Sequence, residues 1–178
     1  MNNSYDAELF CSFYPIMKDF VYHYISYQEI HNQMDSLPGD REFWVYTCDA
    51  HFKAAVISWT MIMGTDSNKT HWKKLFYDNC DRTAAFKKYL KDAHSISEST
   101  WSTLHKDILR FRNEFVAHKT TKFDYPVPSL KNGLIVLYAL EEWIRIQIRP
   151  DYLEGEELSK HESIFRKDIK DTLSLILQ

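Results

Sequence analysis

Residues 110–119, which read Arg-Phe-Arg-Asn-Glu-Phe-Val-Ala-His-Lys, contain the side chains best suited to chemistry. Arg112 has a permanent positive charge and a planar donor fork that matches phosphate. His118 can take up and release a proton near neutral pH, and Asn113 adds an amide that can hold a phosphate or ribose oxygen. A fixed cation beside a proton shuttle is the minimum equipment for cleaving an RNA phosphodiester without a metal ion.

The spacing of the apolar residues predicts that these side chains lie at the end of a helix over about 97–118. Apolar side chains recur there at steps of three and four residues, which is the core-facing seam of an amphipathic helix. This seam consists of Trp101, Leu104, Ile108, Phe111 and Phe115. The next step of three reaches His118, so the histidine stands where a core residue is expected. A half-buried histidine that closes the helix C-terminus explains the same position without any catalytic role.

An ideal α-helix does not bring Arg112 and His118 together. Their Cα atoms are separated by ~9 Å along the helix axis and by ~240° around it. A bend in the last turn closes that gap, and so does a two-fold dimer in which the arginine of one subunit meets the histidine of the other. Arg112 instead shares one side of the helix with His105. Glu114 is spaced to pair with both Arg110 and His118.

Length and composition predict one helical domain over residues 1–178. The chain has 11 Phe, 11 Tyr and 5 Trp but only 4 Gly and 5 Pro, and few breakers among many long side chains favour helices. We therefore expect an all-α fold, an antiparallel helical bundle. Pro15 is expected to kink the first helix or mark its boundary, and Asp40 to cap the second helix. The expected helices cover residues 5–34, 41–63, 71–77, 82–93, 97–118, 130–148 and 156–177, with a loop over 64–70.

Charge and cysteine usage set further bounds. The formal net charge is −3, so a nucleic-acid site has to be local. Residues 69–91 are one candidate, with seven Lys and Arg against two Asp, and the alternative is a solvated face. The three cysteines have neither disulfide-framework nor zinc-site spacing. The spacing of the cysteines also leads us to expect no metal site. Because the chain shows no signal peptide and no uncharged apolar run of transmembrane length, we expect a cytoplasmic protein without membrane contact.

The segment His71-Trp72-Lys73-Lys74 is a second candidate contact for nucleic acid. An indole ring can stack on a base and a lysine can hold a phosphate. The alternative is that Trp72 anchors the core behind a loop. The chain has no GxGxxG, Walker or GxSxG motif, so the classes of nucleotide-binding protein and hydrolase that depend on these motifs are excluded.

The stretch Arg112-Asn113-Glu114-Phe115-Val116-Ala117-His118 resembles the R-x(4–6)-H motif of the HEPN superfamily, in which a polar residue often follows the arginine. Together with Phe111 and Lys119, it is similar to the abortive-infection and toxin branch in particular. Gly64-Thr65-Asp66-Ser67, followed by His71-Trp72-Lys73-Lys74-Leu75, also resembles a segment upstream of the motif in that branch. The resemblance covers the whole chain loosely and residues 111–119 closely.

This resemblance implies a metal-independent endoribonuclease of the toxin or phage-defence type, without a cofactor, whose motif helices meet across a homodimer. It implies that His118 is the general acid or base on the ribose 2′-OH or the leaving oxygen. Arg112 then stabilises the charge that builds on the phosphorane, and Asn113 orients the substrate. RNA and a cognate antitoxin protein are the implied partners. The further residues expected to contact RNA are Lys119, Arg110, His71, Lys73 and Lys74.

Two alternatives remain open at this stage. Some proteins of this superfamily have lost activity and bind only RNA, a nucleotide or another protein. The chain can also be an all-α regulatory domain unrelated to RNA, in which His118 is a residue at the edge of the core.

Overall fold

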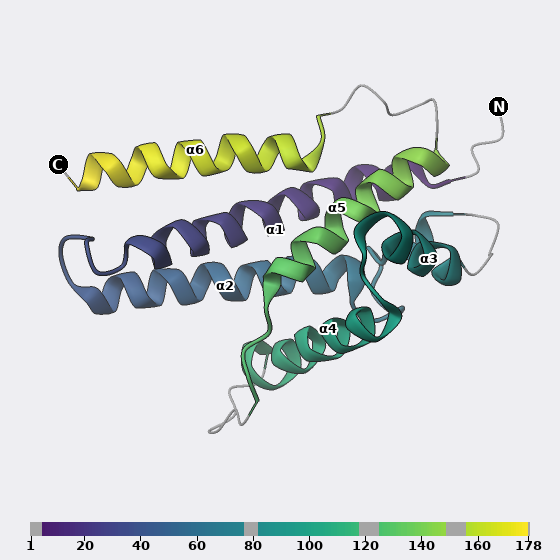
Figure 1. Cartoon of the computed structure of the whole chain (residues 1–178), viewed down its shortest axis with the longest axis horizontal. Helices are drawn as coiled ribbons and strands as arrows, with labels where there is room; N and C mark the ends of the chain where they lie inside the picture. Colours follow the sequence, from purple (N-terminus) through teal and green to yellow (C-terminus); the bar gives the residue numbers. More distant parts are fainter. Residues whose placement is uncertain (1–4, 77–81, 118–124, 149–155, 178) are drawn as a thin grey trace.

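The computed structural model describes residues 5–76, 82–117, 125–148 and 156–177, apart from the side chain of Phe13. These residues form helices and no strand, which confirms the predicted all-α class (Figure 1). An isolated antiparallel bridge joins Tyr5 to Phe76. In chain order the helices are α1 (Ala7–Gln33), α2 (Arg41–Met63), the 3₁₀ turn η1 (Trp72–Leu75), α3 (Thr83–His94), α4 (Glu98–Phe111), the π-helical turn η2 (Arg112–Ala117), α5 (Leu130–Gln147) and α6 (Leu158–Ile176).

The helix starts follow local capping chemistry. The Asp40 carboxylate accepts a hydrogen bond from the Glu42 backbone N–H at 2.8 Å, so the predicted cap of α2 is confirmed. Asp6 does the same for α1 through the Leu9 N–H at 2.9 Å. Pro15 does not end α1, which continues through it. Because the buried face of α1 extends on both sides of the exposed Pro15, its packing outweighs the hydrogen bond that a proline removes.

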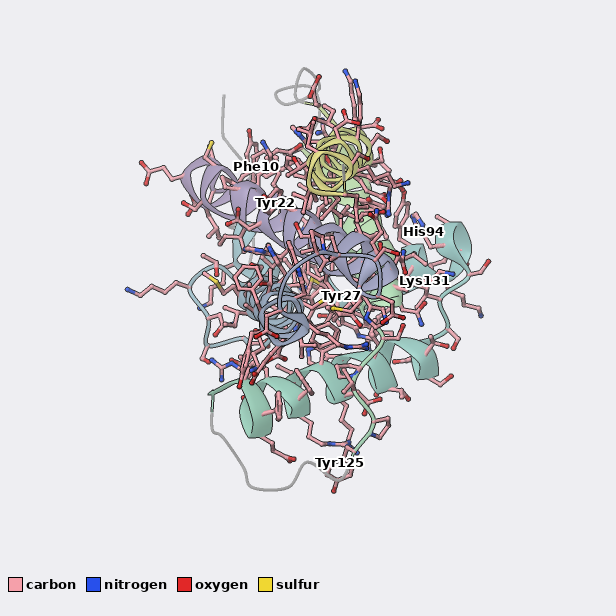
Figure 2. The ribbon with its side chains drawn as sticks, turned by 90° about the vertical axis from the view of Figure 1, so that its left-hand side faces the viewer. Phe10, Tyr22, Tyr27, His94, Tyr125 and Lys131 are labelled. Atoms are coloured by element: carbon pink, nitrogen blue, oxygen red, sulfur yellow. The ribbon has the colours of Figure 1, made fainter. Side chains whose placement is uncertain are left out.

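Helices α1 and α2 form an antiparallel pair, as expected, but α6 runs along α1 in the same direction (Figure 1). At one end of this contact the Tyr14 hydroxyl donates to the Glu156 carbonyl, and further along Arg166 donates to Gln28 at 3.1 Å. Figure 2, in which α6 is seen nearly end-on, shows α6 stacked over α1 and places α4 on the opposite side of the molecule. The predicted antiparallel packing is therefore correct for α1 and α2 but not for α1 and α6.

The core is centred on Trp59 of α2, which is fully buried. Its indole Nε1–H donates to the Gly133 carbonyl at 3.2 Å. A Cβ at Gly133 would lie 3.3 Å from that nitrogen, so glycine allows α5 to approach the ring closely. The predicted seam of α4 packs against this centre, with Leu104, Ile108 and Phe111 buried and Trp101 half-buried. This packing holds the end of α4 against α2, where the candidate site lies.

Candidate functional site

The motif does not continue α4 as an α-helix. Helix α4 ends at Phe111, and residues Arg112–Ala117 form the π-helical turn η2. The expected single helix over 97–118 is therefore wrong in its last turn, and the ~240° separation of an ideal α-helix does not apply there. The wider turn keeps Phe115 against Phe111, with ring centroids 5.0 Å apart. Single π-turns inside helices are rare and occur frequently at functional sites.

Arg112 is exposed and has no carboxylate partner among the described residues. Its Nη1–H donates to the Asn113 side-chain oxygen at 2.9 Å. A neutral amide orients the guanidinium but leaves its charge uncompensated. Several other arginines of the structure do pair with carboxylates, namely Arg41, Arg110, Arg145 and Arg166. Within the described part of the chain, no carboxylate thus compensates the positive charge of Arg112.

Arg112 and Asn113 line a recess of about 250 Å³ between η2, α2 and the segment that follows α2. The polar part of its lining also contains Thr65 and Asn68. None of the described residues that line this recess is acidic. The apolar part of the lining comes from Ile57, Met61, Leu109 and Val116. The structure therefore joins the motif to the upstream segment that resembles the same family, a proximity that the sequence alone does not show.

Hydrogen bonds to the last carbonyls of α2 hold the segment over 64–70 in place. The Asn68 side-chain N–H donates to the Thr60 carbonyl at 2.7 Å, and the Thr70 hydroxyl donates to the Met61 carbonyl at 2.8 Å. These bonds satisfy carbonyl groups that a helix end leaves without intrahelical partners. A Cβ at Gly64 would lie 2.2 Å from the Thr60 carbonyl oxygen, so the chain turns there only with glycine.

His105 ties α4 to the same end of α2. Its Nε2–H donates to the Met63 carbonyl at 2.7 Å and approaches the Gly64 carbonyl at 3.2 Å. The prediction that His105 and Arg112 share one side of their helix is confirmed by this contact and by the position of Arg112 in the recess. His105 therefore acts as a structural anchor that sets the distance between the motif and the 64–70 segment.

His71 and Trp72 lie in the interior, 2% exposed each. The Trp72 ring packs on Phe86 and Trp143, with centroids 5.0 and 5.8 Å away, which confirms that it anchors the core. The expectation that His71 and Trp72 offer a surface for a base is wrong, because neither ring is accessible. The Nδ1 atom of His71 accepts the Lys73 backbone N–H at 3.3 Å, so the ring caps η1 instead.

The two lysines after Trp72 differ in their environment. Lys73 contacts both carboxylate oxygens of Asp66 at 3.1 Å, which compensates its charge. Lys74 is exposed and its Nζ lies 3.4 Å from the Ser67 carbonyl. Further along the basic segment, two more lysines pair with acids, in Lys87–Glu98 and Lys88–Asp92. Much of the predicted local excess of positive charge is therefore neutralised, and Lys74 is the better placed of the two expected RNA contacts.

Arg110 does not pair with Glu114 in the structure. Its guanidinium stacks on the Tyr125 ring at 4.2 Å and lies 3.5 Å from an oxygen of Asp107. The change of winding after Phe111 removes the four-residue register of an α-helix on which the expected pair depended. Figure 2 shows Tyr125 at the outer side of α4, so Arg110 fastens the returning chain to that helix. His118 and Lys119 lie outside the described residues.

Sequence reasoning missed Thr65 and Asn68 as neighbours of the motif. Asn68 follows the end of α2 by a few residues, and an Asn in that position is a recognisable partner for the last helix carbonyls. The position of Asn68 therefore predicts a helix cap, but it does not predict which residues from another segment lie next to Asn68. Their place in the same recess as Arg112 and Asn113 depends on packing between segments more than forty residues apart, as in the bond from His105 to Met63.

Two kinds of feature are absent from the described part of the chain. No three His, Cys, Asp or Glu side chains come together there in a way that would hold a metal ion. None of the helices described is both long and apolar enough to cross a membrane. Comparison with known proteins found no family model, no curated protein and no solved structure that matches the chain.

The burial of His71 makes a prediction for the pH dependence of stability. Burial lowers the pKa of His71 to about 4 although Asp66 lies nearby. The unfolded chain therefore binds this proton more readily, and the free energy of unfolding should fall as the pH drops from ~6.5 toward 4, by at most about 1.4 kcal/mol per pH unit from this group. In His71→Asn, which keeps a cap acceptor, the fall should be shallower in urea unfolding between pH 7.5 and 4.5. Equal slopes for the two proteins would contradict this assignment.

Proposed function

We propose that this chain is a metal-independent endoribonuclease of the HEPN type, a toxin or phage-defence protein that acts as a homodimer. The observation that carries the proposal is the exposed Arg112, which has an amide partner but no carboxylate partner among the described residues. A guanidinium with no described carboxylate partner, beside a recess whose described lining contains no acid, is suited to a phosphate oxygen. The motif resemblance supplies the proton shuttle, His118, and the proposed location is cytoplasmic.

In the proposed reaction His118 removes the proton of a ribose 2′-OH, and the 2′ oxygen attacks the adjacent phosphorus. A P–O2′ bond forms, the P–O5′ bond breaks, and the leaving O5′ takes up a proton from protonated His118, so that the products carry a 2′,3′-cyclic phosphate and a 5′-OH. Arg112 stabilises the negative charge that builds on the phosphorane oxygens. Asn113 holds the guanidinium in position, as it does in the structure. The charge and the proton transfers are both supplied by side chains in this scheme.

The RNA backbone would continue from Arg112 across the neighbouring surface. Lys74 is exposed next to the 64–70 segment. Arg110 lies two residues before Arg112 on α4 and would exchange its contact with Asp107 for a phosphate. Lysines and arginines along such a path hold phosphates without reading sequence. Lys119 belongs to the same proposed path by its place in the motif. A cognate antitoxin would have to shield this surface, which makes the recess its proposed point of contact.

The first test is cleavage of a labelled RNA in EDTA. Arg112→Ala should lower the rate by roughly 100- to 1,000-fold, the usual cost of a group that stabilises transition-state charge. Arg112→Lys should recover only part of the rate, because an ammonium group lacks the planar fork. His118→Ala should lower the rate by roughly 100- to 10,000-fold. Arg41→Ala is the matched control, since Arg41 is exposed but paired with Asp35.

Two outcomes of this assay decide against the proposal. Equal cleavage by the wild type and the Arg112 and His118 variants would place any activity elsewhere or in a contaminant. Tight RNA binding without turnover, lost in Arg112→Ala, would instead favour the non-catalytic binding module. Circular dichroism and urea unfolding of each variant exclude loss of folding as the cause.

A second test asks whether two subunits build the site. If Arg112 of one subunit works with His118 of its partner, dimers that combine an Arg112→Ala and a His118→Ala subunit retain one intact site of two. Random mixing of the two inactive variants should then restore about a quarter of the wild-type rate. A site contained within one subunit would give no recovery. Native mass spectrometry of the mixture, which separates the mixed dimer from the two parent dimers by mass, confirms that subunits have exchanged.

A further inference from the structure

The recess beside Arg112 is built for more than an anion. Its apolar walls come from three elements, with Ile57 and Met61 on α2, Leu109 on α4 and Val116 on η2. Polar side chains stand along one edge, among them Thr65, Asn68 and Asn113. A flat ligand with apolar faces, a hydrogen-bonding edge and an attached anion matches this distribution. Within RNA that description fits a nucleobase whose ribose carries the phosphate at Arg112.

The size of the recess agrees with a single base. Its volume of about 250 Å³ lies below the roughly 300–1,000 Å³ of sites that enclose drug-sized ligands. Ile57 and Met61 are 44% and 39% exposed, although both are apolar. A base that packs on them would remove this surface from water. The polarisable thioether of Met61 also makes favourable contacts with aromatic rings.

The polar edge has a defined hydrogen-bonding character. The Nδ2 group of Asn68 is committed to the Thr60 carbonyl at 2.7 Å, which fixes the orientation of the amide. The Thr65 hydroxyl donates to the Asn68 Oδ1 atom at 3.4 Å and shares a 2.8 Å hydrogen bond with the Ser67 hydroxyl. With the Thr65 proton used in this way, the Thr65 and Asn68 oxygens can each still accept a further hydrogen bond at this edge. An amino group can donate to them, whereas a carbonyl group facing the fixed Oδ1 would bring two acceptors together.

We infer that the recess is a nucleobase subsite, in which Met61 supports the face of the base and Thr65 and Asn68 select a base that carries an amino group. Adenine and cytosine present such a group, at N6 and N4, while uracil presents a carbonyl at the equivalent position. The inference rests on the proposed function, because it takes the anion at Arg112 to be a phosphate of RNA. It makes Thr65 a determinant of the base next to the cleaved bond.

Calorimetric titration of the full chain in EDTA tests this inference without requiring turnover. The probes are adenosine, cytidine and uridine 3′-monophosphates and inorganic phosphate. Adenosine and cytidine monophosphates should bind roughly tenfold more tightly than uridine monophosphate, the change that about 1.4 kcal/mol produces. All three should bind more tightly than inorganic phosphate. In Thr65→Val, which removes the hydroxyl but keeps the shape, the preference for an amino group should shrink.

Matched variants separate the base from the phosphate. Met61→Ala should weaken every nucleotide several-fold and leave inorganic phosphate unchanged. Ile164→Ala should change nothing, because Ile164 is similarly exposed, at 41%, but lies on α6. Arg112→Ala should weaken all four probes.

The outcomes also separate this inference from the proposed function. Equal affinity for all nucleotides and for inorganic phosphate, with RNA cleavage intact, overturns the base subsite and leaves the proposed function standing. No binding of any probe overturns the subsite as well. Selective binding of the amino-bearing nucleotides by a chain that never cleaves RNA supports the subsite and contradicts the proposed reaction.

Discussion

The hydrogen bonds that close the C-terminal end of α2 hold the candidate site together. Asn68 binds the Thr60 carbonyl and His105 binds the Met63 carbonyl at this end, at 2.7 Å each. One bond folds the 64–70 segment back over the helix, and the other fixes α4 beside it. The motif follows α4 directly, so the position of Arg112 relative to Thr65 is a consequence of these two bonds. The buried packing of Trp59 on α5 and α4 holds the helices themselves.

The local parts of this structure were predictable, because they depend on near neighbours. The bounds of α2, its cap at Asp40, and the seam of Leu104, Ile108 and Phe111 follow from capping chemistry and helical periodicity. The π-turn was not predictable in this way, since its residues continue an apolar spacing that an α-helix satisfies equally well. The recess could not be predicted from the sequence for another reason. It forms between two segments that are far apart in sequence, and the periodicity of apolar residues does not indicate which distant segments pack together.

Burial and charge pairing also distinguish the residues that the sequence suggested as ligand contacts. His71 and Trp72 carry groups that can hold a ligand, yet both are enclosed and serve the core and the start of η1. Arg110 and Lys73 have their charges matched by Asp107 and Asp66. Arg112 differs because it is exposed and its described partner is an amide. The type of a residue therefore shows which interactions its side chain can make. Its burial and its partners within the protein decide whether the side chain can make those interactions with a ligand.

The central claim is that Arg112 receives an RNA phosphate and that side chains alone drive its cleavage. Mass spectrometry of the ends produced from a defined RNA in EDTA tests this most directly. The account predicts fragments with 2′,3′-cyclic phosphate and 5′-OH ends from the wild type, formed roughly 100- to 1,000-fold more slowly by Arg112→Ala. Fragments with 3′-OH ends, or cyclic ends formed at the same rate by Arg112→Ala, would contradict it.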